Sequence, residues 1–235
     1  MIPCDYAARP RSRRAMLILL SSAFALALAG CGGSDSSSPE PQSAPLPSPP
    51  TVPPLSTATP IVLSFGSTVG TTQHWQDGDT STGGQGADID GLSCLQTMPE
   101  DYHVHVHVSI FLNGDQLIVP KQIGIPRGPG DTDKCFYSLH THDGSGEIHV
   151  EAAAPATFTL GQLFDIWGQP LDTTNVNVGA IVGLPITIYM FDDGETKATV
   201  YTDDPRKLEL TRHRQITIQI GTAISTIPVY DFAGA

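Results

Sequence analysis

The sequence predicts an α+β fold made mostly of antiparallel β-hairpins with one short helix; a β-sandwich with a helical insert is the alternative. Three observations lead to this expectation. Apolar and polar residues alternate through residues 102–112, a period of two that is typical of a strand with one buried face. Turn sequences such as Asn113-Gly114 separate several segments of this kind. Residues 159–168 instead carry the signals of a short capped helix.

The elements follow one another along the chain. The predicted strands are an apolar run at 61–65, a hairpin of 102–112 with 115–120, a hairpin of 135–142 with 147–152, a hairpin of 185–191 with 198–202 around Asp193-Gly194, and a closing strand at 214–221. Thr159 is a suitable N-cap for a helix over residues 160–167. Gly168, followed by Pro170, is typical of the end of that helix.

The start of the chain has the pattern of an export signal. Four arginines precede the apolar residues 15–30, a run shorter than the ~20 residues of a membrane-spanning helix. The run ends in Leu28-Ala29-Gly30-Cys31, which resembles the lipobox of bacterial lipoproteins. That resemblance implies cleavage before Cys31 and attachment of lipid to this cysteine, so the protein would be held on a membrane.

Residues 31–60 are rich in Pro, Ser and Gly, so they cannot bury enough apolar surface to fold. We therefore expect a signal peptide at 1–30, a disordered tether at 31–60 and one β-rich, histidine-containing domain at 61–235. Gly32 follows the predicted lipidated cysteine at a position where aspartate would resemble an inner-membrane retention signal. We expect a lipid anchor in the outer membrane of the cell envelope, with the domain facing the periplasm or the cell surface.

The charge of the chain excludes one class of partner. The full sequence has 12 Lys and Arg against 24 Asp and Glu, a formal charge of −12. Cleavage after residue 30 would remove four arginines and one aspartate and bring the charge to −15. Such an acidic surface repels nucleic acid and attracts cations. We therefore expect no nucleic-acid partner.

Two cysteines, Cys94 and Cys135, remain beyond the signal and the lipobox. In an oxidising compartment outside the cytoplasm, we expect them to form a disulfide. A cysteine-containing metal site is the alternative, but neither cysteine has a second cysteine or a histidine at a ligand spacing.

Histidines are concentrated in one part of the chain: six of the eight lie between residues 103 and 149. His103, His105 and His107 alternate with valines, so they share the strand face opposite the valines. At about 3.3 Å per residue, His103 and His107 lie roughly 13 Å apart, too far to share one ion comfortably. We expect His105 to chelate with one neighbour and the third histidine to orient a ligand or serve another ion.

The hairpin of 135–142 with 147–152 adds three more histidines. If its turn is centred on Gly144-Ser145, His140 faces His149 and His142 faces Glu147. Directly opposed side chains have Cβ atoms about 5 Å apart, so such imidazoles can converge on one ion at about 2.0–2.1 Å. The candidate metal ligands are His103, His105, His107, His140, His142 and His149, with Glu147 as a further ligand or an orienting group.

Imidazole ligands suit zinc, copper, nickel and iron, and a carboxylate moves the preference towards zinc or iron and away from Cu(I). We predict a lipid-anchored protein that binds copper or zinc through this histidine face. A metalloenzyme is one alternative, with Glu147 or Asp143 as the proton-transfer group. The sequence shows no substrate cavity, which favours a binding protein over an enzyme. A structural or adhesive envelope module, with histidines used for polar packing, is the other alternative.

Four segments resemble a family of exported, functionally uncharacterised prokaryotic proteins. These segments are GLSC at 91–94, YHVHVHVSIFLNG at 102–114, CFYSLHTHDGSGEIHVE at 135–151 and FTLGQLFDIWGQPL at 158–171. The resemblance covers most of residues 90–220 and includes the Tyr-His-x-His-x-His strand, the Cys-x4-His-Thr-His-Asp hairpin and the Phe-Asp-Ile-Trp-Gly helix end. It implies that the shared pattern contains Cys94, the six clustered histidines, Asp143, Phe164, Asp165 and Trp167. It implies no particular activity.

Overall fold

A computed structural model describes residues 51–78, 80, 83–172, 177–178 and 181–234. These residues fall in one compact unit, Pro49–Ala235. The predicted signal peptide, Cys31 and the predicted tether up to residue 50 lie outside the described residues. The part of the chain that the structure describes contains no helix with the length and hydropathy of a membrane span.

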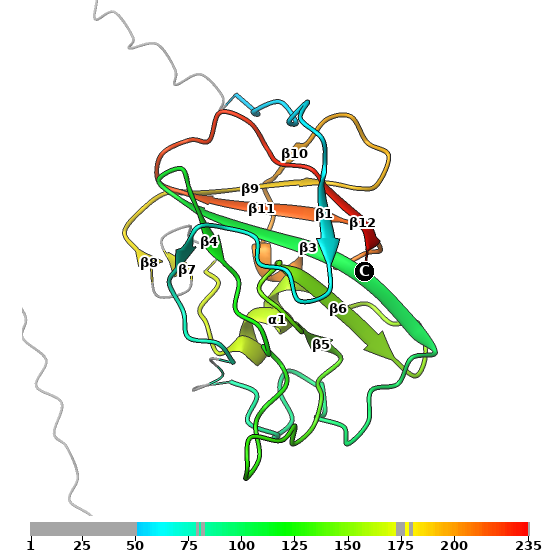
Figure 1. Cartoon of the computed structure of the whole chain (residues 1–235). Coiled ribbons are helices and arrows are strands. Elements are labelled where there is room, and N and C mark those ends of the chain that lie inside the picture. The colour runs from blue at the N-terminus through cyan, green and yellow to red at the C-terminus, as the bar shows by residue number, and fades with distance from the viewer. Residues whose placement is uncertain (1–50, 79, 81–82, 173–176, 179–180, 235) are drawn as a thin grey trace, which may run out of the picture. The chain divides into compact units, whose positions relative to one another are not determined.

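The described elements are mostly strands, with one α-helix (Figure 1). In chain order they are β1 (Ile61–Ser64), β2 (Thr72–Gln73), β3 (Tyr102–Leu112), β4 (Asp115–Ile118), β5 (Leu139–His140), β6 (Glu147–Ala152), α1 (Leu160–Trp167), β7 (Asn177–Val178), β8 (Ile181–Val182), β9 (Ile186–Phe191), β10 (Thr199–Tyr201), a 3-10 turn (Pro205–Lys207), β11 (Gln215–Ile220) and β12 (Tyr230–Gly234). Among the described residues, the main sheet runs β10-β9-β11-β3-β4-β2, and β6 with β5 extends it beside the first half of β3.

The three predicted hairpins are confirmed. β3 pairs antiparallel with β4, β5 with β6, and β9 with β10. Between β3 and β4, Asn113 and Gly114 have φ values of 52° and 97°, the left-handed backbone that a two-residue hairpin turn requires. Strand β5 covers only part of the predicted arm, because residues around it bond instead to the loop at 120–125: the Thr141 N–H donates to the Ile123 carbonyl at 3.0 Å.

Most strand pairs of the main sheet are antiparallel, as predicted, but the sheet is mixed rather than purely antiparallel. β11 lies parallel to β3, β2 lies parallel to β4, and β1 lies parallel to β12 in a separate two-stranded sheet. The hairpin turns reveal only pairs that are adjacent in sequence, whereas these pairs join strands that lie far apart in the chain. The coarser expectation of a mainly β fold with one helix is confirmed.

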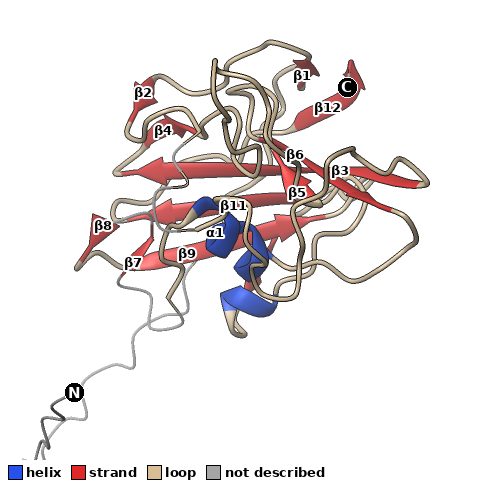
Figure 2. Ribbon diagram, turned by 90° about the horizontal axis from the view of Figure 1, so that it is seen from below, coloured by secondary structure: helices blue, strands red, loops and turns tan. Residues whose placement is uncertain are grey.

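Helix α1 forms where the sequence predicts it. The Thr159 side chain accepts a hydrogen bond from the Gln162 N–H, and the Gln162 side chain accepts one from the Thr159 N–H. Gly168, at φ 75°, ends the helix in the left-handed conformation. Figure 2 shows the helix lying across strands β9 and β11.

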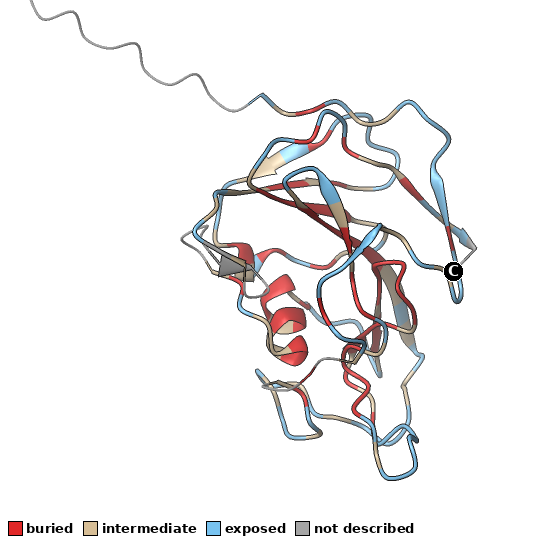
Figure 3. Cartoon of the chain, turned by 60° about the vertical axis from the view of Figure 1, so that its left-hand side comes forward, coloured by how far each residue is buried: buried red, intermediate tan, exposed pale blue. Residues whose placement is uncertain are grey.

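The two faces of the main sheet differ in chemistry. On the helix side, Val106, Val108, Ile216 and Ile218 belong to the same buried hydrophobic cluster as residues of α1, and the helix is coloured as mostly buried in Figure 3. The opposite face carries the alternate residues of β3 and β11, which include all three histidines of β3 and three buried polar residues of β11, Gln215, Thr217 and Gln219. The histidines therefore project away from the apolar core, as the alternation predicts.

Two further predictions concern the disulfide and the border between the tether and the domain. The predicted disulfide between Cys94 and Cys135 is present. The sequence predicts that residues 52–56 belong to the tether, but Val52 and Leu55 pack against the apolar cluster that contains Phe111, and the Ser56 N–H donates to the Ile227 carbonyl. This part of the predicted tether therefore packs on the domain.

Candidate metal centre

Three neighbouring strands bring the histidines together. β6 pairs with β3 along one edge and with β5 along the other. His105 on β3 lies opposite His149 on β6, and His149 lies opposite His140 on β5. The predicted pairing of His140 with His149 is therefore confirmed. The two histidine-bearing segments share one face because β6 lies between them.

Two carboxylates flank this histidine row on β6. Glu151 lies opposite His103, and Glu147 lies opposite His107. Both glutamates are buried, at 3% and 6% exposure respectively. Glu147 is one of the ligands predicted from the sequence, whereas Glu151 is not. The alternation of Glu147, His149 and Glu151 along β6 was the signal that could have identified it.

We call the first candidate site the inner group, which consists of His140, His142, His149 and Glu151. One ligand atom from each residue lies within 4.8 Å of the others. His140 Nε2 is 3.2 Å from His142 Nε2, and Glu151 Oε1 is 3.7 Å from His140 Nε2 and 3.5 Å from His149 Nδ1. Ligands about 2.0–2.1 Å from a tetrahedral ion lie roughly 3.3 Å from one another. The inner group can therefore hold a metal ion with little rearrangement.

We call the second candidate site the outer group, which consists of His103, His105 and His149. Its ligand atoms also lie within 4.8 Å of one another. His105 Nε2 is 2.9 Å from His103 Nε2, which is 3.2 Å from His149 Nδ1. The two groups differ in access to solvent, because the His103 side chain is 37% exposed and the His140 side chain is 0% exposed.

Neighbouring groups orient several of these rings. His140 Nδ1 donates to the Tyr137 carbonyl at 2.9 Å, which leaves the lone pair of Nε2 free to bind an ion. Glu147 Oε1 lies 3.2 Å from His105 Nδ1, so the carboxylate faces the nitrogen that does not contact His103. Glu147 belongs to neither group, although its carboxylate lies beside His105.

His107 does not join the other histidines, so its inclusion among the candidate ligands is corrected. Its Nε2 donates to the Ser145 carbonyl at 2.9 Å, its Nδ1 lies 3.3 Å from Ser109 Oγ, and its ring stacks on Tyr230 at 3.5 Å. Tyr230 covers the ring, and the side chain of Gln215, which lies opposite His107 on β11, holds the Tyr230 backbone through two hydrogen bonds. His107 is therefore enclosed, whereas His103 and His105 lie on the part of β3 that precedes its pairing with β11.

Burial favours the neutral form of three of these imidazoles. It lowers the pKa of His140 to about 3 and the pKa of His105 to about 4, and it also lowers the pKa of His142. Neutral imidazole is the form that binds metal. Burial alone would raise the pKa of Glu151, but the contacts with His149, His140 and His103 outweigh it and hold this pKa below its ordinary value. His140, His142 and Glu151 of the inner group therefore have the protonation states that favour cation binding at neutral pH.

Two carboxylate oxygens in this region are buried without a hydrogen-bond partner. They are Glu151 Oε2 and Glu147 Oε1. Glu147 Oε1 is near His105 Nδ1, but the contact lacks the geometry of a hydrogen bond. A buried polar atom without a partner costs roughly 1–3 kcal/mol, more if it is charged. A bound cation beside Glu151 would remove this cost.

We expect the metal-free protein to lose stability as the pH falls below 6.5. Unfolded His140 and His107 take up protons near pH 6.5, whereas burial lowers the pKa of both residues in the folded protein to about 3. Because the unfolded chain binds more protons in this interval, each of the two histidines destabilises the fold by about 1.4 kcal/mol per pH unit. Urea denaturation of the metal-free protein between pH 7 and pH 4 measures this slope.

The titration of Glu147 opposes this loss of stability at low pH. Burial raises the pKa of Glu147, so Glu147 adds stability as the pH falls and offsets part of the loss. Replacement of His140 by glutamine should reduce the slope between pH 6.5 and pH 5, because one buried imidazole is then absent. An unchanged stability across that interval in the wild-type protein would contradict the assignment of neutral, buried histidines.

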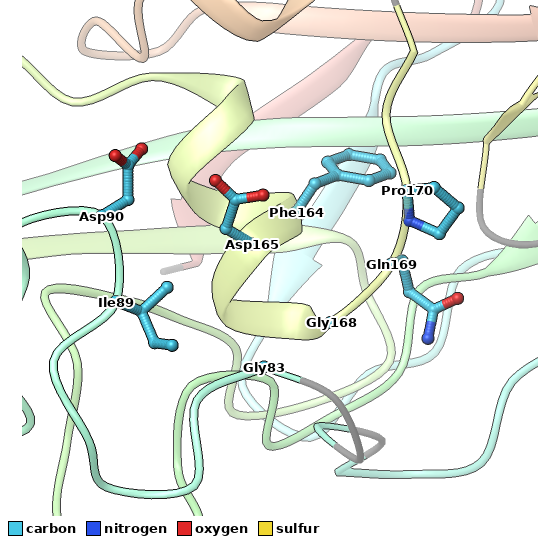
Figure 4. Close-up of a pocket in the computed structure, with 8 residues that line it drawn as sticks. All are labelled: Gly83, Ile89, Asp90, Phe164, Asp165, Gly168, Gln169 and Pro170. Atoms are coloured by element: carbon cyan, nitrogen blue, oxygen red, sulfur yellow. The ribbon is translucent and has the colours of Figure 1, made fainter. Parts of the chain in front are cut away.

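A separate open pocket lies at the C-terminal end of helix α1 (Figure 4). It is lined by Gly83, Ile89, Asp90, Phe164, Asp165, Gly168, Gln169 and Pro170. None of these residues belongs to the inner or the outer group. Asp165 forms an ion pair with Arg206, so its charge is already compensated. This pocket therefore offers no histidine ligand and does not form part of the candidate metal centre.

No protein-family model, no curated protein and no solved structure matches this chain.

Proposed function

We propose that the protein binds a divalent transition metal, copper or zinc, through the inner group. The observation that carries the proposal is the approach of four ligand atoms, three imidazole nitrogens and one carboxylate oxygen, to within 4.8 Å of one another. The buried, unpartnered Glu151 Oε2 supports it, because a cation would neutralise that carboxylate.

The ligand chemistry favours copper or zinc over the alkaline-earth ions. Ca²⁺ and Mg²⁺ prefer oxygen ligands, whereas three of the four atoms in the inner group are imidazole nitrogens. Within residues 51–234, as far as the structure describes them, no thiolate is present at the site, because Cys94 and Cys135 are joined in a disulfide. A nitrogen-rich set with one carboxylate suits Zn²⁺ or Cu²⁺ better than Cu⁺.

We further propose that this metal-binding domain is anchored by lipid at Cys31 on the outer membrane of the cell envelope. The lipobox-like sequence that ends at Cys31, the Pro- and Ser-rich segment after it and the acidic composition support this part of the proposal. In that setting the protein would sequester, sense or hand on the ion. Replacement of Cys31 by serine should release the protein from the membrane fraction; a variant that remains membrane-bound would contradict the lipid anchor.

Metal analysis of the full-length chain, produced without a histidine tag, tests the proposed function. We expect at least one equivalent of bound Zn²⁺ or Cu²⁺ after dialysis, and a higher melting temperature with either ion, because a ligand that binds only the folded state stabilises it. Ca²⁺ and Mg²⁺ serve as controls and should leave the melting temperature unchanged. A chain that retains neither transition metal and shows no shift with either would contradict the proposal and favour a structural role for the histidines.

A further inference from the structure

We propose that the histidine face holds a second divalent transition-metal ion, bound by His103 and His105 of the outer group next to the ion of the inner group. This inference rests on the proposed function, because the two ions would share residues of strand β6. It adds a two-metal centre to a protein whose proposed function requires only one ion.

Each side of β6 carries a chelating pair of its own. On β3, His103 Nε2 and His105 Nε2 are 2.9 Å apart. On the other side of β6, His140 Nε2 and His142 Nε2 are 3.2 Å apart. Both separations match neighbouring ligands of one ion, roughly 3.3 Å for a tetrahedral site. The face therefore carries two chelating pairs with β6 between them.

One ion cannot use both pairs. Ligand atoms that bind the same ion at about 2.1 Å can be at most about 4.2 Å apart. Among the described residues, neither group contains both the pair from β3 and the pair that includes His140. His149 is the residue that the two groups have in common. Two adjacent ions, one for each pair, satisfy this geometry.

Glu151 lies where a bridging carboxylate would be needed. Its Oε1 is 3.2 Å from His103 Nε2 of the outer group and 3.7 Å from His140 Nε2 of the inner group. Its Oε2 is buried and has no hydrogen-bond partner. A carboxylate can bind one ion through each oxygen, and proteins with two-metal sites hold their ions about 3.5–4 Å apart. Glu151 can therefore serve both ions and reduce the repulsion between them.

The exposure of the ligands predicts how the two ions differ. The side chains of His103 and His105 are 37% and 15% exposed, whereas the His140 side chain is fully buried. Water has readier access to the outer ion, so we expect it to bind more weakly and to exchange faster than the inner ion. The outer group is then the position at which an ion is accepted from or passed to a partner molecule.

The number of zinc ions bound to the full-length, untagged chain tests this inference. Equilibrium dialysis against zinc sulfate should give two equivalents per wild-type chain and one per His103→Ala chain. His103 is the most exposed of the ligands, so this variant should fold, and an unchanged circular dichroism spectrum verifies it. His105→Asn is the second variant and should also bind one equivalent. His74→Ala, which removes an exposed histidine outside both groups, should retain two.

One equivalent in the wild-type chain would overturn the second site but leave the proposed function intact, whereas no bound zinc would overturn both. Two equivalents in both outer-group variants would also overturn the inference. Electron paramagnetic resonance with two equivalents of Cu²⁺ provides an independent measurement. We expect a spectrum broadened by coupling between neighbouring ions; two uncoupled signals would overturn the adjacent placement.

Discussion

Replacing His140 and His142 together by alanine should weaken the tighter zinc site by about a thousandfold or more. The pair supplies two of the four ligand atoms of the inner group, and His140 is the ligand most fully enclosed by the protein. Loss of a residue that merely orients a ligand already costs roughly 10–100-fold in metal affinity, so loss of two ligands costs more. Competition with a chromophoric zinc chelator measures the affinity of this variant.

His74→Ala is the matched control for this double variant, because it removes an exposed imidazole that lies outside both groups. It should leave the zinc affinity unchanged. The double variant should also lose most of the rise in melting temperature that zinc produces in the wild-type chain. If the double variant binds zinc as tightly as the wild type, the inner group is not the metal site.

Removal of the disulfide should lower the free energy of unfolding by about 4 kcal/mol. The bond joins residues 41 positions apart, and in the chain-entropy model closure of such a loop restricts the unfolded chain by about that amount. The variant that carries both Cys94→Ala and Cys135→Ala tests this, with urea denaturation in the metal-free state as the measurement. A loss of less than about 1 kcal/mol would contradict the structural role of the bond.

The same double variant should also bind zinc less tightly. Next to the disulfide, Leu95 and Phe136 exchange two backbone hydrogen bonds, and the following carbonyl, that of Tyr137, holds the His140 ring. Loosening this segment lowers the fraction of molecules in which His140 Nε2 faces the inner group. Wild-type protein treated with a reducing agent is the control and should show the same two changes.

The elements that the sequence predicts well are those with local causes. Asn113-Gly114 is sufficient to define a hairpin because only a few residues tolerate its left-handed backbone. The capping pair Thr159 and Gln162 and the terminal Gly168 define helix α1 in the same way. The alternation of the second hairpin gives the pairing of His140 with His149, because a shift of one residue would turn the whole face over.

The features that the sequence could not reveal depend on pairing between distant segments. No turn sequence indicates that β11 pairs parallel with β3. This pairing places Gln215 opposite His107 and leaves His103 and His105 outside the paired part of β3. His107 looks equivalent to His103 and His105 in the sequence, yet of the three only His107 lies opposite β11 and in a buried network. The alternation along β6 places Glu151 on the face of His149, but only the pairing of β3 with β6 shows that it lies opposite His103.

Anomalous diffraction at the zinc edge, from crystals of the zinc-loaded protein, tests the metal centre most directly. We expect a strong peak within about 2.1 Å of His140 Nε2, His142 Nε2 and a Glu151 oxygen, with a second, weaker peak next to His103 and His105. Peaks that lie only at surface carboxylates, with no metal at the ligand atoms of the inner group, would contradict the account.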